Sequence, residues 1–139
     1  MELRYYSVSG RVCLTHVFQA LRLPRDAGRG VMALDVVRCR KLVALDDSDA
    51  LSRFALGQAL FQEGGIEALH EAAEHLLFAN AKAPAHLATY HVLGQVLIKL
   101  GRNSEAREVL SAGCEKAEAV GVGMGHDLGP AMAKLLETL

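Results

Sequence analysis

RFALGQALFQEG (residues 53–64) and YHVLGQVLIKLG (residues 90–101) both contain Leu-Gly-Gln-x-Leu and both end at a glycine. The pattern begins at Leu56 and again at Leu93, 37 positions later. Glycine often follows the last residue of a helix, because it adopts the left-handed conformation that ends one. Each segment therefore predicts a helix, and the repetition predicts that the two helices occupy equivalent places in the fold.

The segments that follow also repeat, at a shorter spacing. EAAEHLLFANAKA (residues 71–83) aligns with EAREVLSAGCEKA (residues 105–117) at a spacing of 34. The change from 37 to 34 places a three-residue insertion in the first unit, within GGIEALH (residues 64–70), where we expect it to lengthen a turn. Two helices joined by a turn, written twice, account for both spacings.

This unit resembles the tetratricopeptide repeat (TPR), a 34-residue helix–turn–helix with a Leu-Gly in its first helix and a small residue within its second. Arg53 departs from the pattern, because the family has a large aromatic residue there, and Glu118 stands where proline is usual. The residues that match are Leu56, Gly57, Leu60, Gly64, Glu71, Ala72, Ala79 and Pro84 in the first unit, and Tyr90, Leu93, Gly94, Leu97, Gly101, Glu105, Ala106 and Gly113 in the second.

The resemblance covers about residues 33–139 and implies an all-α, TPR-like helical-hairpin solenoid. ALDVVRCRKLVALDDSDA (residues 33–50) resembles the second helix of a preceding half-repeat. Pro130 lies near the first turn of a last helix, whose apolar stripe (Leu128, Met132, Leu135, Leu136 and Leu139) is typical of a C-terminal capping helix. We therefore predict a domain over 31–139 with about two full repeats, a leading half-repeat and a cap. The expected helices are approximately 33–46, 49–63, 67–82, 86–100, 103–119 and 130–138.

Residues 1–30 differ in charge from the rest of the chain. They hold five arginines and two acidic residues, a net charge of +3, whereas residues 31–139 hold ten basic and fourteen acidic residues, a net charge of −4. Three interpretations of this basic N-terminal extension stay open. It is an extension that is disordered or forms one extra helix, a stretch upstream of a protein that starts at Met32, or a targeting peptide.

The composition excludes several classes of function. No dense Lys/Arg stripe with interleaved aromatic residues appears, and no apolar run approaches the roughly 20 residues of a membrane span. We therefore expect no nucleic acid and no membrane as partners. The three cysteines form no CxxC pair, so a reducing compartment, the cytoplasm, fits best.

No catalytic or metal-binding pattern survives inspection. His70 and His75 are five residues apart, whereas metal ligands on one helix are usually separated by three or four. GVGMGHDLG (residues 121–129) lacks the spacing of a dinucleotide-binding loop. We expect no catalytic residues, no metal and no cofactor, so the chain is predicted not to be an enzyme.

The resemblance implies that the first helix of each unit lines a concave groove that holds a peptide or a partner helix. The helical period assigns eight residues to that groove: Phe54, Gln58, Phe61, Gln62, His91, Gln95, Ile98 and Lys99. Apolar side chains mixed with amides suit an extended or helical peptide. The alternative is that Phe54 and Phe61 complete the core between adjacent units.

Two functions are compatible with the sequence. The first is a non-enzymatic protein–protein interaction module, in which the repeated Gln58 and Gln95 contact a peptide of a partner. The second is a self-assembling structural subunit, for example a homodimer, with the groove filled by a neighbour or by its own N-terminal segment. About three repeats are needed for a stable array, and this chain supplies close to that minimum.

Overall fold

The computed structural model describes residues 35–121 and 127–139, and this part of the chain consists of helices joined by short turns. The expectations about residues 1–30, about Met32 and about the glycines within 122–126 lie outside the described residues. The chain divides into two units, Met1–Ala33 and Leu34–Leu139, and only the second is described here. Its helices are α2 (Val36–Leu45), α3 (Ala50–Glu63), α4 (Ile66–Lys82), α5 (Leu87–Lys99), α6 (Asn103–Val120) and α7 (Leu128–Glu137).

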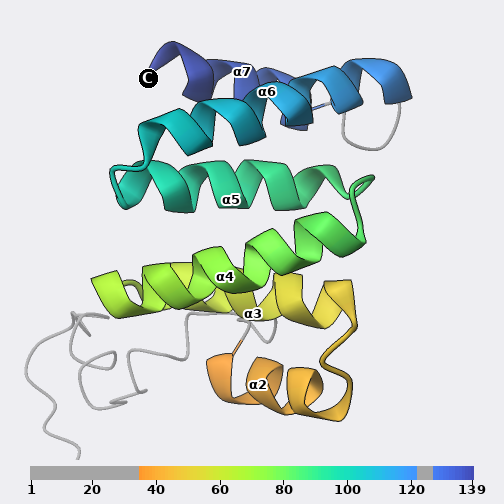
Figure 1. The fold of residues 1–139 in the computed structure, drawn as a ribbon, viewed down its shortest axis with the longest axis vertical. Coiled ribbons are helices and arrows are strands. Elements are labelled where there is room, and N and C mark those ends of the chain that lie inside the picture. The colour runs from red at the N-terminus through yellow and green to blue at the C-terminus, as the bar shows by residue number, and fades with distance from the viewer. Residues whose placement is uncertain (1–34, 122–126) are drawn as a thin grey trace, which may run out of the picture. The chain divides into compact units, whose positions relative to one another are not determined.

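Each helix packs against the next one along the chain, so that the helices form a stack (Figure 1). In this stack α3 and α4 make one hairpin and α5 and α6 make the next. The first helices of the two hairpins, α3 and α5, also contact each other. Within the unit, α2 lies at one end of the stack and α7 at the other.

Local signals in the sequence fix where the helices begin and end. The Asp49 carboxylate accepts hydrogen bonds from the backbone N–H groups of Leu51 and Ser52, which caps the start of α3. Gly64 and Gly65 separate α3 from α4 with φ of +81° and +95°, a backbone conformation that residues with a Cβ rarely adopt. These two glycines therefore form the turn of the first hairpin.

The prediction that the three inserted residues lengthen the turn of the first hairpin is wrong. By the spacing of 34, the first residue of α6, Asn103, corresponds to residue 69, whereas α4 already begins at Ile66. The insertion therefore extends α4 at its N-terminus. Three residues are nearly one helical turn, and Glu67, Ala68 and Leu69 are compatible with a helix, so the added length continues α4 without displacing its later contacts.

The repeated Leu-Gly marks the closest approach of two helices in each hairpin. A Cβ added to Gly57 would lie 2.6 Å from Leu76 Cγ on α4, and one added to Gly94 would lie 2.7 Å from Leu110 Cγ on α6. Leu76 and Leu110 are themselves 34 positions apart, so both hairpins use the same contact. At both positions a side chain would force the facing leucine or the helices to shift.

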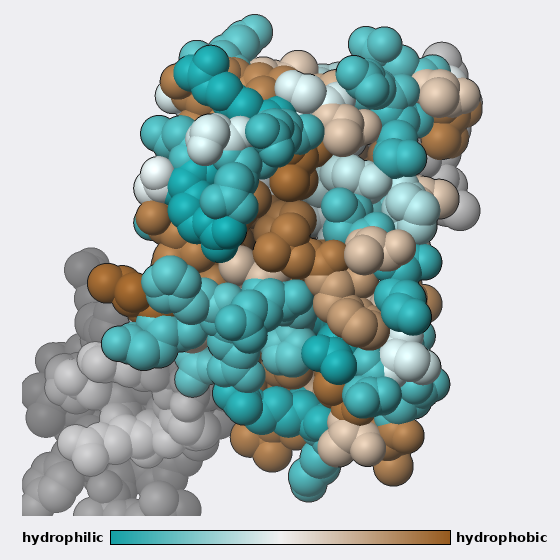
Figure 2. Space-filling model, viewed as in Figure 1, coloured by the Kyte–Doolittle hydropathy of each residue, from teal (hydrophilic) through white to brown (hydrophobic). Residues whose placement is uncertain are grey.

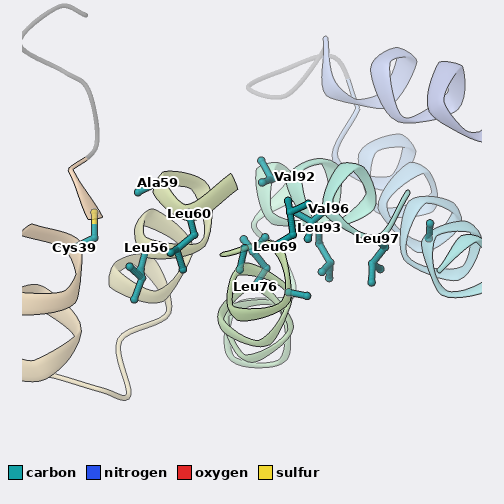
Figure 3. Close-up of a cluster of buried hydrophobic side chains, with 13 residues drawn as sticks. Cys39, Leu56, Ala59, Leu60, Leu69, Leu76, Val92, Leu93, Val96 and Leu97 are labelled. Carbon is teal, nitrogen blue, oxygen red and sulfur yellow. The ribbon is translucent and has the colours of Figure 1, made fainter. Parts of the chain in front are cut away.

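The core is a band of buried aliphatic side chains that runs from α2 across α3 and α4 to α5 (Figure 3). A second, smaller cluster joins α5, α6 and α7 through Tyr90, Leu110 and Met132. Met132 of α7 lies against Gly113, where an added Cβ would be 2.5 Å from its sulfur. Thus α7 covers the last hairpin. None of the helices in the described ranges is both long and apolar enough to cross a membrane.

Candidate peptide-binding face

Four of the eight predicted groove residues lie on α3 and four on α5, where Lys99 is the last residue of the helix. We call this surface the α3/α5 face. Gln62 and Lys99 are exposed, whereas the six other side chains are half-buried. Phe54, Phe61 and Ile98 also pack against the buried core. These three side chains therefore border the core, and their exposed parts belong to the α3/α5 face.

Two aromatic contacts link α3 to α5 at separate points along the face. The Phe54 ring meets the His86 ring edge-on, with centroids 4.7 Å apart. The His86 imidazole is held in place by Thr89, whose Oγ1 lies 2.7 Å from His86 Nδ1. Further along, Lys99 Nζ lies 4.5 Å from the centroid of the Phe61 ring, a cation–π contact. Sequence reasoning missed His86, because its role depends on where α5 begins.

Gln58 and Gln95 lie between these two contacts. Gln58 is one helical turn from Phe54 and one from Phe61, and Gln95 is one turn from Lys99. Both residues are half-buried, their amide atoms remain accessible to solvent, and in the part of the chain that the structure describes neither side chain has a hydrogen-bond partner. A primary amide offers two donors and an acceptor, so each glutamine presents unused hydrogen-bonding capacity at the centre of the face.

His91 adds a third polar group to this face. Burial lowers the pKa of His91, because desolvation disfavours the charged imidazolium. Its imidazole is therefore neutral at pH 7 and offers one donor and one acceptor. The α3/α5 face as a whole combines two partly exposed aromatic rings, neutral hydrogen-bonding groups and one exposed cation, Lys99.

A second polar cluster lies where α2, α3 and α4 meet, and it explains the departure at Arg53. The Arg53 guanidinium lies over the Phe78 ring, with Cζ 4.3 Å from the centroid, and its Nε donates to the Asp47 carbonyl at 2.8 Å. In the second hairpin the aromatic ring is Tyr90 on α5, and Ala112 takes the place of Phe78. The aromatic ring is thus on the second helix, α4, in the first hairpin and on the first helix, α5, in the second hairpin. The alignment of Phe78 with Ala112 is the sequence signal that could have revealed this difference.

The same cluster fixes the protonation of His75. Arg53 Nη1 lies 3.2 Å from His75 Nδ1, and because a guanidinium can only donate, that nitrogen accepts the hydrogen bond. The proton of the neutral ring is then on Nε2, which faces Glu71 Oε1 at 3.7 Å. Glu71 also pairs with Arg40 of α2 at 2.9 Å, so the cluster ties three helices together.

This arrangement predicts that stability falls in mild acid. Burial lowers the pKa of His75, and the Arg53 charge lowers it further despite the opposing Glu71. The unfolded chain, whose histidines titrate near a pKa of about 6.5, then binds protons that the folded chain does not, so the unfolding free energy decreases as pH falls below about 6.5. We expect His75→Gln to reduce this dependence in denaturant unfolding at pH 7.5, 6.5 and 5.5.

The matched control is His70→Gln, which changes an exposed histidine on the same helix. This control should keep the pH dependence of the wild-type protein. His91 also contributes, because its pKa is lowered, so His75→Gln should leave a residual slope. An unchanged slope in His75→Gln would contradict the assigned role of His75.

The polar groups of the described residues do not suggest metal or thiol chemistry. In residues 35–121 and 127–139 no three His, Cys, Asp or Glu side chains gather where they could hold a metal ion. Burial raises the pKa of the Cys39 and Cys114 thiols, so both stay protonated near neutral pH and are poor nucleophiles. The α3/α5 face, in contrast, presents hydrogen-bonding side chains and partly exposed apolar side chains.

Comparison with known proteins supports the fold. No protein-family model matches the chain, and no curated protein matches it in sequence. Among solved structures, the chain is similar to the crystal structure of MamA, with 23% sequence identity, a TM-score of 0.52, and coverage of 89% of this chain and 71% of MamA. MamA is a TPR-like helical-repeat protein, and at this identity the likeness concerns the fold alone. The chain therefore has the predicted all-α fold, a TPR-like helical-hairpin solenoid.

Proposed function

We propose that this chain is a non-enzymatic protein-interaction module of the TPR type, and that its α3/α5 face binds an extended or helical peptide of a partner protein. A TPR-like fold suggests a protein-interaction or scaffold role. The observation that carries the proposal is the pair Gln58 and Gln95. They recur at equivalent positions, are half-buried and have no hydrogen-bond partner among the described residues.

The composition of the face indicates how a peptide would be held. Backbone N–H and C=O groups of the peptide would pair with the two amides, since an amide can serve as donor and acceptor at once. Apolar side chains of the peptide would contact the exposed parts of Phe54, Phe61 and Ile98. Lys99 lies at the end of α5, so it would favour an acidic residue at the corresponding end of the peptide.

The test uses peptides selected from a random display library on the immobilised full-length protein. For peptides that bind, we expect Gln58→Ala combined with Gln95→Ala to weaken affinity about tenfold, because two hydrogen bonds of about 0.5–1.5 kcal/mol each are lost. Titration calorimetry gives the affinities. The melting temperature should change little, because neither amide makes an internal hydrogen bond in the described part of the chain.

The matched control is Glu74→Ala combined with Ser111→Ala, which truncates one exposed polar residue on each second helix, α4 and α6. This variant should bind the selected peptides like the wild-type protein. Equal affinity of the glutamine variant and the wild-type protein for every selected peptide would reject the α3/α5 face as the binding site.

A further inference from the structure

The helix at one end of the stack, α2, has apolar residues on two opposite sides. Val36, Cys39 and Val43 pack toward α3 and the core. At about 100° per residue, Val37, Leu42 and Leu45 fall within an arc of about 140° on the other side. There the exposed fractions are 59% for Val37, 49% for Leu42 and 84% for Leu45. This second side has no packing partner among the described helices.

The other end of the stack is closed in a different way. The apolar residues of α7 are turned into the structure, since Met132 is fully buried and Leu135 and Leu136 pack against its cluster. The residues that α7 exposes are small or charged, such as Ala133 and Lys134. Of the two helices at the ends of the stack, α2 exposes large apolar side chains and α7 does not. Exposed apolar residues gathered on one side of a helix are typical of interaction sites.

Two cations lie within the same arc of α2. Arg38 and Lys41 are exposed, and neither makes an ion pair with any residue in the ranges that the structure describes. Arg40, by contrast, is on another side and is paired with Glu71. Figure 2 shows hydrophobic and hydrophilic side chains mixed at the end of the stack where α2 lies. The surface is therefore apolar and basic together.

We propose that this surface, the α2 outer face (Val37, Arg38, Lys41, Leu42 and Leu45), docks an amphipathic helix of a partner protein that carries acidic residues beside an apolar stripe. A helix is the matching shape, because the helices of this stack pack against one another through apolar side chains. Acidic residues complement this surface because Arg38 and Lys41, which make no ion pair in the described part of the chain, lie among the three apolar side chains. The α2 outer face shares no residue with the α3/α5 face, so this is a second interaction surface.

Charge argues against the other occupants of this face. In a symmetric dimer the same patch meets itself, which would bring Arg38 and Lys41 of two copies together. Residues 1–30 have a net charge of +3, so they do not complement a basic patch either. A flat anionic membrane would also meet Asp35, Asp46 and Asp47, which are exposed at the two ends of α2, whereas a single docked helix can contact the cations between them. An acidic helix is the occupant that the charges favour.

The probe for the test is a synthetic helical peptide of about 15 residues, with leucines at i, i+3, i+4 and i+7 and glutamates on either side of them. Its control has lysine for every glutamate. In fluorescence anisotropy with the full-length protein, we expect the glutamate peptide to bind at least tenfold more tightly than the lysine peptide. Salt should weaken that binding, because exposed charges are screened.

Variants of the full-length chain locate the site. Leu42→Ser with Leu45→Ser should lower affinity at least tenfold, and Arg38→Glu with Lys41→Glu should reverse the preference between the two peptides. Leu77→Ser, at an exposed leucine of α4, should have no effect. Gln58→Ala with Gln95→Ala should also have no effect, so this result is independent of the test of the α3/α5 face.

Three outcomes would overturn the proposal. The first is that the two peptides bind equally, or that neither binds. The second is a dimer in light scattering that Leu42→Ser with Leu45→Ser dissociates, which would assign the face to a second copy. The third is binding to phosphatidylserine vesicles that Arg38→Glu with Lys41→Glu abolishes, which would assign the face to a membrane surface.

Discussion

Leu76→Ala is expected to lower the free energy of unfolding by about 2–5 kcal/mol, the range for removing a fully buried leucine. Leu76 is 0% exposed and lies where α4 meets Gly57 of α3. Its loss removes apolar contacts and leaves a cavity at the closest approach of the first hairpin. Denaturant unfolding of the full-length protein, monitored by circular dichroism, measures the change.

A double-mutant cycle tests whether the Leu76–Gly57 contact is responsible. Gly57→Ala alone places a Cβ 2.6 Å from Leu76 Cγ, so the clash opposes the gain of about 1 kcal/mol that alanine normally brings to a helix. In the Leu76→Ala background both contacts below 3 Å are gone and only the Ala72 carbonyl oxygen, at 3.3 Å, remains close, so Gly57→Ala should stabilise the protein. With Leu110→Ala, in the other hairpin, the effects should add. If the effects of Gly57→Ala and Leu76→Ala also added, as those of Gly57→Ala and Leu110→Ala should, the Leu76–Gly57 contact would be contradicted.

Gly94→Leu is expected to destabilise the protein by about 1–3 kcal/mol, because a bulky side chain overpacks the second hairpin. Even a single Cβ at this position would lie 2.7 Å from Leu110 Cγ, and Leu110 is itself fully buried. The whole side chain cannot be accommodated unless α5 and α6 separate. The melting temperature of the full-length variant should fall accordingly.

The control is Ala81→Leu, which adds a larger side chain at an exposed position of α4. Away from packed contacts, surface substitutions usually change stability by no more than about 0.5 kcal/mol. A melting temperature of Gly94→Leu equal to that of the wild-type protein would show that the repeated Leu-Gly does not mark a close helix contact.

The hairpins could be predicted from the sequence because their closest contact is written twice. A leucine and a glycine at fixed spacing specify one helix that approaches another, and Leu76 and Leu110 recur at the matching distance. The placement of the insertion could not be predicted from the spacings alone. Whether three residues join a turn or a helix depends on the backbone, and here Gly64 and Gly65 make the turn complete without them.

The polar clusters were harder to predict than the hairpins, because they depend on several helices at once. Arg53 replaces an aromatic residue only because Phe78 on α4 supplies a ring for its guanidinium. The contact between Phe54 and His86 likewise depends on the residue at which α5 begins. For Gln58 and Gln95, the helical period indicated the face, but the half-burial of the two residues and the lack of hydrogen-bond partners in the described part of the chain required coordinates.

The most direct test of the central claim is to observe the glutamine side chains during peptide binding. In 1H–15N NMR spectra of the full-length protein, the side-chain amide signals of Gln58 and Gln95 can be assigned by comparison with Gln58→Ala and Gln95→Ala. We expect both signals to shift together as a selected peptide is added, with the same affinity as calorimetry gives. Shifts confined to α2, or to the outward residues of α4 and α6, would contradict peptide binding at the α3/α5 face.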